Sequence, residues 1–324
     1  MSPKKVLITG ASGVLGAAVY NAFKNVGHDV LGLAYSQSKE GLPKVNLVDT
    51  EQTAQLFAKV KPDWVIHCAA ERRPDAFKPV SIAYFELRKC YHNRTVIQEN
   101  PGAAAAAKLN EQVPGQLAVL CRENNATLVY ISTDYVFDGT SPPYYPMSTP
   151  HPLQEYGKTK REGELAVLGV EGADVIILRV PVLYGPAQKN SDTAVNILLD
   201  IVEDQSGKKY MMDNVAIRYP TNVVDIAAFL VRLSESSEPL PPSRVIHFSA
   251  DETFTKYQMC QVFGKILGLP IDHVTADNRQ PTGAEAVTRP LNCQLSTEET
   301  TRLFGSLNCS KFEEWWKNHL NKVQ

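Results

Sequence analysis

The chain has 324 residues, of which 44% are hydrophobic, and its formal net charge is −2 at pH 7. That length buries a large core and is typical of one large or two modest domains. The balanced charge excludes the basic surfaces of nucleic-acid and anionic-membrane binders, and no apolar run approaches the roughly 18 residues of a spanning helix.

Cysteine usage and the start of the chain point to one compartment. The six cysteines are scattered without a C-x-x-C pair, which predicts reduced thiols. The first expected strand begins by residue 5, which leaves no room for a signal peptide. We therefore expect a cytoplasmic protein, and we expect no bound metal.

The N-terminal stretch has the pattern strand, glycine turn, helix. Val6 to Ile8 is a short apolar strand, and glycines then lead into an apolar-periodic helix from Val14 to Phe23. Such a turn needs glycine so that it can be tight, approach a pyrophosphate and let the helix lie close to the sheet. The free N–H groups at the helix start favour phosphate. The residues expected at the nucleotide are Gly10, Ser12, Gly13, Leu15 and Gly16.

The end of the second expected strand, Asp29 to Tyr35, bears on the choice of nucleotide. NAD-preferring folds usually place Asp or Glu there to hold the ribose hydroxyls. Here Ala34 to Lys39 contains no acid. Ser36 and Lys39 can instead receive a 2′-phosphate, although a solvated loop is the simpler interpretation. The sequence favours NADP over NAD.

A third strand, Lys44 to Val48, and a helix, Glu51 to Val60, are expected next. The apolar strand from Trp64 then ends in small residues, which let a cofactor lie across the edge of a sheet. His67 lies inside this strand and is expected to be a core histidine. The small residues are Cys68, Ala69 and Ala70.

The loop Glu71 to Asp75 follows this strand directly, at the edge of the sheet where ligands bind. Its two arginines, Arg72 and Arg73, are of the kind that phosphate recognition uses. A salt-bridged loop is the alternative. Beyond it, Val80 to Gln98 mixes aromatic and basic residues without a clear period.

The middle of the chain holds the second chemical motif. A helix from Ala103 to Arg122 is expected to be interrupted at Pro114-Gly115, and Leu128 to Ser132 is expected to be a strand. A proline-rich loop, Pro142 to Pro152, is predicted to be a lid over the site. Tyr156 and Lys160 then share one face of a helix that runs to Leu168, because they are four residues apart.

Elements of the second half of the sequence are expected to contribute to both lobes. The expected elements are a strand Val175–Leu178, a helix Asp192–Asp204, a turn and helix through Tyr219–Ala227, a strand Arg244–Ser249, a helix Lys256–Leu267 and a final helix bearing Trp315 and Trp316. The strand at Arg244 is predicted to rejoin the N-terminal sheet.

These motifs resemble a known family. The stretch Ser132 to Gly139, followed by Tyr156-Gly157-Lys158-Thr159-Lys160, resembles the dTDP-4-dehydrorhamnose reductases, which belong to the extended short-chain dehydrogenase/reductase superfamily. Arg289-Pro290 with Asn292 looks like the substrate-lobe signature of that family. Cys68 to Asp75 is similar to a narrower branch, the regulatory β subunits of methionine adenosyltransferase.

The resemblance implies an α/β fold, a Rossmann-type doubly wound parallel sheet with a smaller C-terminal substrate lobe. It implies residues 1–185 as the NADP-binding domain and 186–324 as the substrate-binding lobe, with 215–230 and 244–249 packing back on the first domain. Set against the family, about twenty residues around 80–98 look inserted. A surface lobe, a partner-binding loop and a gene-model error all remain open for that segment.

The resemblance also implies roles for the site. Tyr156 would give a proton to a carbonyl oxygen, and the ammonium of Lys160 would lower the pKa of that phenol. Thr133 would position the same oxygen, and Asn110 would relay protons through water. Lys160 would also hold the nicotinamide ribose. Further cofactor contacts would come from Asn46 and Leu47 at the adenine and from Pro181 at the nicotinamide.

Two functions from different classes follow. One is a regulatory subunit that binds NADP(H) and the catalytic subunit of methionine adenosyltransferase, favoured by Glu71 to Asp75. The other is an NADPH-dependent reductase of a nucleotide-linked keto-sugar, favoured by the intact Thr133, Tyr156 and Lys160. The sequence ranks the regulatory subunit first.

Overall fold

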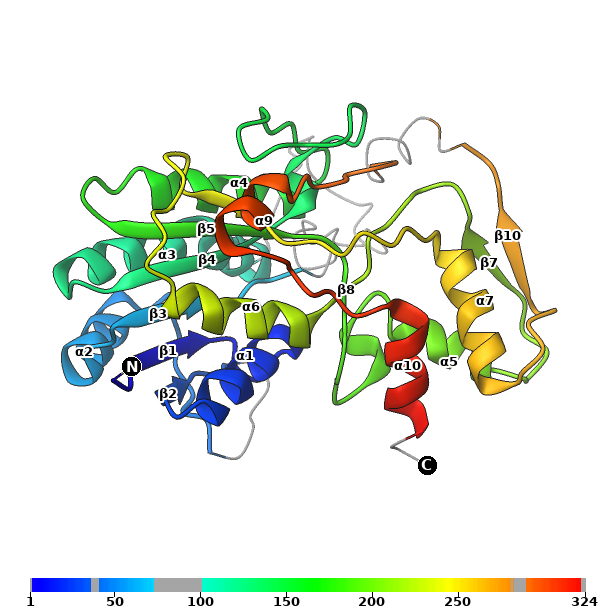
Figure 1. Ribbon diagram of the computed structural model, residues 1–324, viewed down its shortest axis with the longest axis horizontal. Coiled ribbons are helices and arrows are strands. Elements are labelled where there is room, and N and C mark those ends of the chain that lie inside the picture. Colours follow the sequence, from blue (N-terminus) through cyan, green and yellow to red (C-terminus); the bar gives the residue numbers. More distant parts are fainter. Residues whose placement is uncertain (1, 36–40, 73–100, 281, 283–289, 322–324) are drawn as a thin grey trace, which may run out of the picture.

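The computed structural model describes residues 2–35, 41–72, 101–280, 282 and 290–321. Its centre is a six-stranded sheet in the order β2-β1-β3-β4-β5-β9, with every neighbouring pair parallel (Figure 1). The strands are β1 (Lys5–Thr9), β2 (Asp29–Gly32), β3 (Trp64–His67), β4 (Thr127–Thr133), β5 (Asp174–Val180) and β9 (Val245–His247). The doubly wound parallel sheet predicted from the sequence is confirmed.

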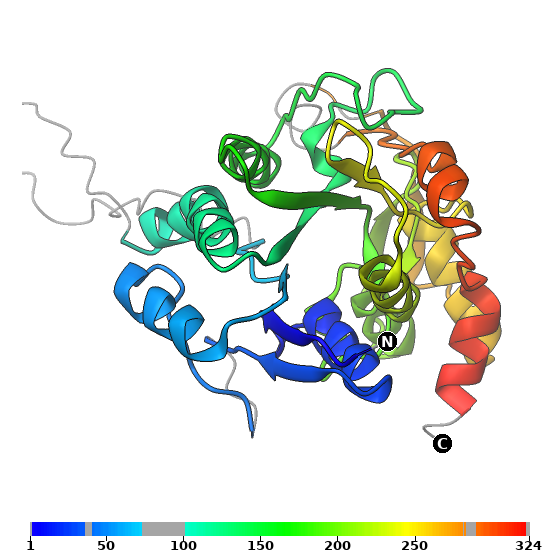
Figure 2. The ribbon, with the colours of Figure 1, turned by 60° about the vertical axis from the view of Figure 1, so that its left-hand side comes forward.

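Successive side chains along each strand point to opposite faces of the sheet, and each face has its own hydrophobic core. In β1, Val6 and Ile8 pack with α1 (Val14–Asn25) and α6 (Val223–Glu235), whereas Leu7 packs on the opposite face. The opposite face is covered by α2 (Thr50–Val60), α3 (Pro101–Glu123) and α4 (Glu155–Leu168) (Figure 2). Because both faces are buried, the strands are continuously apolar.

A smaller lobe is formed by the C-terminal half. It contains α5 (Ile197–Glu203), α7 (Lys256–Leu267), α10 (Phe312–Asn321) and the parallel pair β7 (Tyr210–Asp213) and β10 (Val274–Asp277). Its core is aromatic: Tyr184, Phe263, Phe312 and Trp316 are all buried together. The remaining elements are β6 (Leu183–Tyr184), β8 (Thr221–Asn222), α9 (Glu298–Phe304) and the 3-10 helices η2 (Asp134–Val136) and η3 (Asn190–Asp192).

Two segments from the second half return to the first domain. β9 pairs with β5, so the strand expected at Arg244 to Ser249 does rejoin the sheet. Asn222 caps α6 by accepting a hydrogen bond from the N–H of Val224, and α6 then packs beside α1. Among the described residues, no helix is long and apolar enough to cross a membrane.

Three expected elements are corrected. Lys44 to Val48 is not a strand, because only Lys44 makes a β-bridge, to Ala34. The helix expected from Asp192 begins at Ile197: the side chains of Thr193 and Asn196 hydrogen-bond to each other and to nearby backbone groups, which competes with the helical pattern.

The third correction concerns Pro114, which does not interrupt α3. Proline has no N–H, so it leaves the carbonyl four residues earlier without its helical donor. That carbonyl belongs to Asn110, and the hydroxyl of Tyr130 in β4 lies 3.3 Å from it and 3.3 Å from the carbonyl of Lys160, so the two carbonyls share its proton. A tertiary hydrogen bond thus satisfies the carbonyl that proline leaves free, and the helix continues.

Candidate nucleotide-binding and catalytic site

The glycine turn after β1 is packed so closely that side chains are excluded. Gly10 has φ +67, and a Cβ added there would lie 2.8 Å from the backbone nitrogen of Ala69. A Cβ on Gly16 would lie 2.1 Å from the carbonyl oxygen of Gly10. Gly13 is the N-cap of α1 and brings no capping side chain. The start of α1 therefore offers backbone N–H groups to an anion.

Two further predicted cofactor contacts lie beside this turn. The side chain of Leu15 is buried in the core next to Val19, so Leu15 faces the turn with its backbone. Ser12 is half-buried. Ser36 and Lys39, expected at the 2′-phosphate, lie outside the described residues, as do Arg73 to Asp75, Arg289 and the segment 80–98.

The ends of β1 and β3 are tied together beside the turn. Thr9 Oγ1 lies 2.7 Å from Nδ1 of His67 and accepts the N–H of Ala69 at 3.2 Å. Burial, with a smaller effect of Lys160, lowers the pKa of His67 to about 3. His67 is a neutral core residue, as predicted. Burial raises the pKa of the Cys68 thiol to about 12, and Ala70, like Cys68, is half-buried at this edge.

The two residues expected at the adenine behave differently. Asn46 is half-exposed, and its side chain accepts the N–H of Val48 at 3.2 Å. Leu47 is 7% exposed and packs in the core with Leu33 and Phe57. The side chain of Leu47 is thus turned away from solvent.

The structure brings the three residues of the predicted triad to one place. Thr133 is the last residue of β4, and Tyr156 and Lys160 lie on α4. The hydroxyl of Thr133 donates to Asp134 Oδ1 at 3.1 Å and accepts the N–H of Tyr135 at 3.2 Å. Hydrogen bonding between Thr133 and Tyr156 opposes, without reversing, the rise in the pKa of the phenol that burial causes. The ammonium of Lys160 lies 3.9 Å from the ring centre of Tyr130.

The expected lowering of the Tyr156 pKa is wrong. Burial, with the nearby Asp134 carboxyl, raises the pKa of Tyr156 to about 12, against smaller opposing effects of Arg72 and Thr133. Burial also lowers the pKa of Lys160 to about 7. Burial disfavours the charged form of each group because both lie away from water, and for Tyr156 this cost outweighs the opposing effects of Arg72 and Thr133.

Asn110 holds the loop after β3. Its Oδ1 accepts the N–H of Glu71 at 2.9 Å, and its Nδ2 donates to the carbonyl of Glu71 at 2.8 Å and to Thr159 Oγ1 at 3.1 Å. Asn110 is 1% exposed. Its proton relay stays a prediction, whereas its contact with Glu71 is a role that the sequence did not indicate.

Arg72 reaches the other lobe. Its guanidinium donates to the carbonyl of Asp192 in η3, and it is near enough to Tyr156 to lower the pKa of that phenol. Pro181, expected beside the nicotinamide, is buried immediately after β5. The ends of β3, β4 and β5 thus supply one edge of the site, and η3 lies opposite at Arg72.

Two sets of buried polar residues were missed by the sequence analysis. Asp134 is 6% exposed next to Thr133, and burial raises its pKa to about 7. Glu164 is completely buried and accepts hydrogen bonds from Ser132, Arg161 and Arg179. The only sequence signal for Asp134 is that it follows Thr133, and the only one for Glu164 is that it lies one helical turn after Lys160.

The proline-rich loop is anchored to the C-terminal segment. Tyr144 is buried, its ring stacks on Phe137 at 4.1 Å, and its backbone exchanges hydrogen bonds with Gln294 and Ser296. His151 is exposed, with Nδ1 3.2 Å from Asp138 Oδ2. The predicted lid function stays a prediction.

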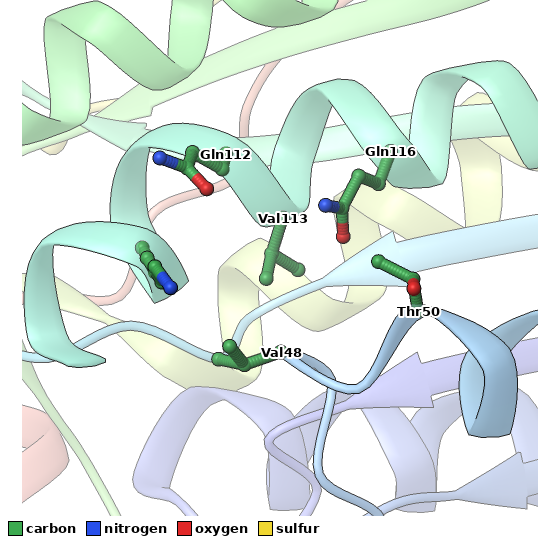
Figure 3. A pocket seen from close by; sticks show the side chains of 6 residues that line it. Val48, Thr50, Gln112, Val113 and Gln116 are labelled. Atoms are coloured by element: carbon green, nitrogen blue, oxygen red, sulfur yellow. The ribbon is translucent and has the colours of Figure 1, made fainter.

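Figure 3 shows a pocket of about 200 Å³ elsewhere on the first domain. Val48, just before α2, and Thr50, the first residue of α2, face Gln112, Val113 and Gln116 on α3. None of the predicted site residues lines it. It therefore contributes nothing to the chemistry of the triad.

Comparisons with known proteins agree on the relationship. The family described as "RmlD substrate binding domain" matches residues 4–80 and 91–324. Methionine adenosyltransferase 2 subunit beta of Xenopus laevis is 39% identical over 313 residues, which cover 96% of this chain and 82% of that protein. The break in the family match, between 80 and 91, falls within the segment 80–98.

Solved structures agree on the fold. A dTDP-4-dehydrorhamnose reductase of Bacillus anthracis in complex with NADP has a TM-score of 0.78 at 22% identity, covering 99% of this chain and all of that one. The enzyme WbmG of Bordetella bronchiseptica in complex with NAD has a TM-score of 0.76 at 19% identity, covering 99% of this chain and 94% of that one. At these identities the likeness establishes the fold alone.

Proposed function

This chain belongs to the RmlD substrate binding domain family and, within it, to the branch of the methionine adenosyltransferase 2 β subunits; from this premise, we propose that it is an NADP-binding regulatory subunit of methionine adenosyltransferase. In that role it acts in S-adenosylmethionine biosynthesis by binding the catalytic subunit. We place it in the cytoplasm, and we assign nucleotide binding to residues 1–185 and the second lobe to 186–324.

The nucleotide assignment is supported by the shape of the turn after β1. The strand order reverses between β1 and β3, and ligands of open α/β sheets bind at such a reversal. Gly10 and Gly16 leave no room for side chains, and the start of α1 is free of a capping side chain. The proposed contacts are Gly10, Ser12, Gly13, Leu15, Gly16, Ser36, Lys39, Asn46, Leu47, Cys68, Ala69, Ala70, Arg72, Tyr156, Lys160 and Pro181.

One observation carries the choice of a regulatory role. Arg72 crosses from the end of β3 to the carbonyl of Asp192 and lies beside Tyr156. A charged side chain that also bonds the second lobe therefore lies near the hydroxyl that a keto-sugar would have to reach. The relative that is 39% identical over 96% of this chain is a β subunit of methionine adenosyltransferase 2.

The alternative is an NADPH-dependent dTDP-4-dehydrorhamnose reductase, favoured by the assembled Thr133, Tyr156 and Lys160. Bound NADPH would supply the hydride. With a pKa of about 12, the phenol of Tyr156 is protonated at neutral pH and can give a proton to the carbonyl oxygen. Thr133 would orient that oxygen, and Asn110 would connect the site to water.

Tyr156→Phe separates the two functions, because it removes the proton donor and keeps the ring. For a regulatory subunit, we expect the variant and the wild type to bind the catalytic subunit of methionine adenosyltransferase with equal affinity in a pull-down with purified proteins. We expect weak or absent NADPH oxidation with dTDP-4-dehydrorhamnose in both. Tyr145→Phe, at an exposed tyrosine of the proline-rich loop, is the matched control.

A reductase would give the opposite result in the same two measurements. A reductase would oxidise NADPH readily with the keto-sugar, and Tyr156→Phe would slow turnover by about 10²–10⁴-fold, the usual contribution of a general acid. Robust turnover of this kind, without any binding of methionine adenosyltransferase, would reverse the ranking of the two functions.

A further inference from the structure

The pocket in Figure 3 lies between the start of α2 and the middle of α3, apart from the triad. Val48 and Val113 lie on opposite sides of it and form its apolar part. Val113 is 1% exposed and belongs to the hydrophobic core, so packing fixes its position. The pocket volume of about 200 Å³ exceeds the roughly 150 Å³ of a cavity that accepts benzene, so a ligand of up to about ten non-hydrogen atoms fits.

The α2 side of the pocket is held by the turn before that helix. The N–H of Val48 donates to Asn46 Oδ1 at 3.2 Å, and the N–H of Asn46 donates to Gln52 Oε1 at 2.9 Å. Asp49 caps α2 by accepting the N–H of Gln52 at 2.9 Å. Both walls are thus in place before a ligand enters, which reduces the cost of ordering them on binding.

Helical spacing places the polar side chains of α3 in one row. Lys108, Gln112 and Gln116 follow one another at intervals of four residues, so they share one face of the helix and are spaced about 6 Å apart along its axis. Thr50, on the opposite wall, lies on the Gln116 side of the pocket. In the part of the chain that the structure describes, these four side chains have no hydrogen-bond or ion-pair partner. They can therefore meet a ligand without breaking a bond within the protein.

We propose that this pocket binds a small anion with an apolar middle and an uncharged polar end, that is, a short carboxylate or phosphate ester that also carries a hydroxyl or amide group. Lys108 is the one charged residue in the lining that the structure describes, and its ammonium holds the anionic group. Val48 and Val113 contact the apolar middle. The far end meets Gln116 and Thr50, whose side chains can both donate and accept.

The carboxylates beside Thr50 in the sequence leave this arrangement intact. Neither Asp49 nor Glu51 lines the pocket. Asp49 caps α2, and Glu51 accepts a hydrogen bond from Gln55 Nε2 at 3.2 Å. Both residues are exposed, so salt screens their repulsion of an anion. A direct contact with Lys108 is charge-assisted, which makes it about twice as strong as a neutral hydrogen bond.

Two exposed positions of α3 supply the test variants. Lys108→Gln removes the cation and keeps a side chain that can donate a hydrogen bond. Gln112→Glu adds a negative charge one turn from Lys108 and repels an anion. Lys59→Gln, in the last turn of α2 and outside the lining, is the matched control for the loss of one positive charge. Because all three positions are exposed, we expect the variants to fold, which thermal unfolding checks.

Calorimetric titration of the full chain uses two matched pairs of probes. They are 6-hydroxyhexanoate against 6-hydroxyhexanamide, and 4-hydroxybutyl phosphate against 1,4-butanediol. We expect at least one anion to bind the wild type and Lys59→Gln equally, and to bind Lys108→Gln about three- to tenfold more weakly, as for the loss of one charge-assisted contact at a half-open site. Gln112→Glu should also weaken that anion. The neutral compounds should not distinguish the four proteins.

The same titrations are repeated with saturating NADP. The anion should bind unchanged, because the lining of the pocket shares no residue with the proposed nucleotide contacts. Loss of anion binding in the presence of NADP would assign the anion to the nucleotide site and overturn the inference.

The pair of probes that responds identifies the source of the negative charge. An effect confined to 6-hydroxyhexanoate assigns a carboxylate, and one confined to 4-hydroxybutyl phosphate assigns a phosphate. Equal binding of both anions to the wild type, Lys108→Gln and Gln112→Glu overturns the inference, as does the absence of any anion binding. The titrations without NADP decide the role of Lys108 whether or not the proposed function is correct.

Discussion

Burial sets the protonation of the side chains around Tyr156. The pKa of His67 falls to about 3, that of Lys160 falls to about 7 and that of Tyr156 rises to about 12. Each shift favours the neutral form, as expected when water is removed from a titratable group. Burial thus makes it harder to charge each of these three side chains than in water.

The choice of nucleotide depends on individual residues after β2. Because Ala34 to Lys39 contains no acid, we expect calorimetric titration to show tighter binding of NADP than of NAD. Ser36→Asp should weaken NADP by about tenfold or more through like-charge repulsion and leave NAD little changed. Ala54→Glu, which adds one charge at an exposed position of α2, is the control. Equal affinity of the wild type for both nucleotides would show that this reasoning is wrong.

At the scale of elements, Glu164 joins α4 to two strands and a loop. Its carboxylate accepts Ser132 of β4 at 2.6 Å and Arg179 of β5 at 2.8 Å, and Arg179 also donates to the carbonyl of Pro146 at 3.3 Å. These bonds lower the pKa of Glu164 against the opposing effect of burial. The pair therefore holds α4 against the sheet at the level of Thr133.

Glu164→Gln should destabilise the fold, because it leaves the buried guanidinium of Arg179 without its opposite charge. Removing one partner of a buried pair typically costs about 3–5 kcal/mol, which urea unfolding at pH 7 measures. Glu162→Gln, on the exposed face of the same helix, should change stability by less than about 0.5 kcal/mol.

The pH dependence of this effect has a definite sign. Because the folded pKa of Glu164 is lowered, its contribution is present above the ordinary pKa of glutamate and disappears as the pH falls through the lowered value. The difference between wild type and Glu164→Gln should accordingly shrink in acid. A difference that is small at pH 7 would mean that the pair does not hold α4.

At the scale of the whole molecule, two lobes share one chain that crosses between them more than once. The first domain is completed by β9 and α6 from the second half of the sequence. The second lobe has its own aromatic core around Phe312 and Trp316. Because the segment 80–98 is aperiodic and the family match omits 81–90, we propose that it is an insertion outside both cores.

Replacing residues 80–98 by a short glycine–serine linker should leave the two-lobed body folded. We expect thermal unfolding to stay cooperative and the midpoint to shift by only a few degrees, since exposed insertions are tolerated. A chain with the same nineteen residues in shuffled order should behave alike. Loss of the unfolding transition in both would show that the segment is packed in the core.

The sequence by itself determined the features that neighbouring residues encode. The glycine turn, the alternation in β1 and the pair Tyr156 and Lys160 on one helical face all depend on local geometry, and they led to the parallel sheet and to the family. The core position of His67 and the return of β9 to the sheet were also predicted. In a chain of this class, a short apolar run is typically a strand of the parallel sheet, buried on both faces.

The tertiary structure decided what depends on residues far apart in the chain. Pro114 lies within a continuous helix because Tyr130 hydrogen-bonds the carbonyl that proline leaves free. Asn110 holds Glu71, and Arg72 turns toward the second lobe to meet Asp192. The pKa of Tyr156 rises because the folded chain removes water from it. No local pattern carries this information, since hydrogen bonds across the fold and burial exist only once the lobes have packed.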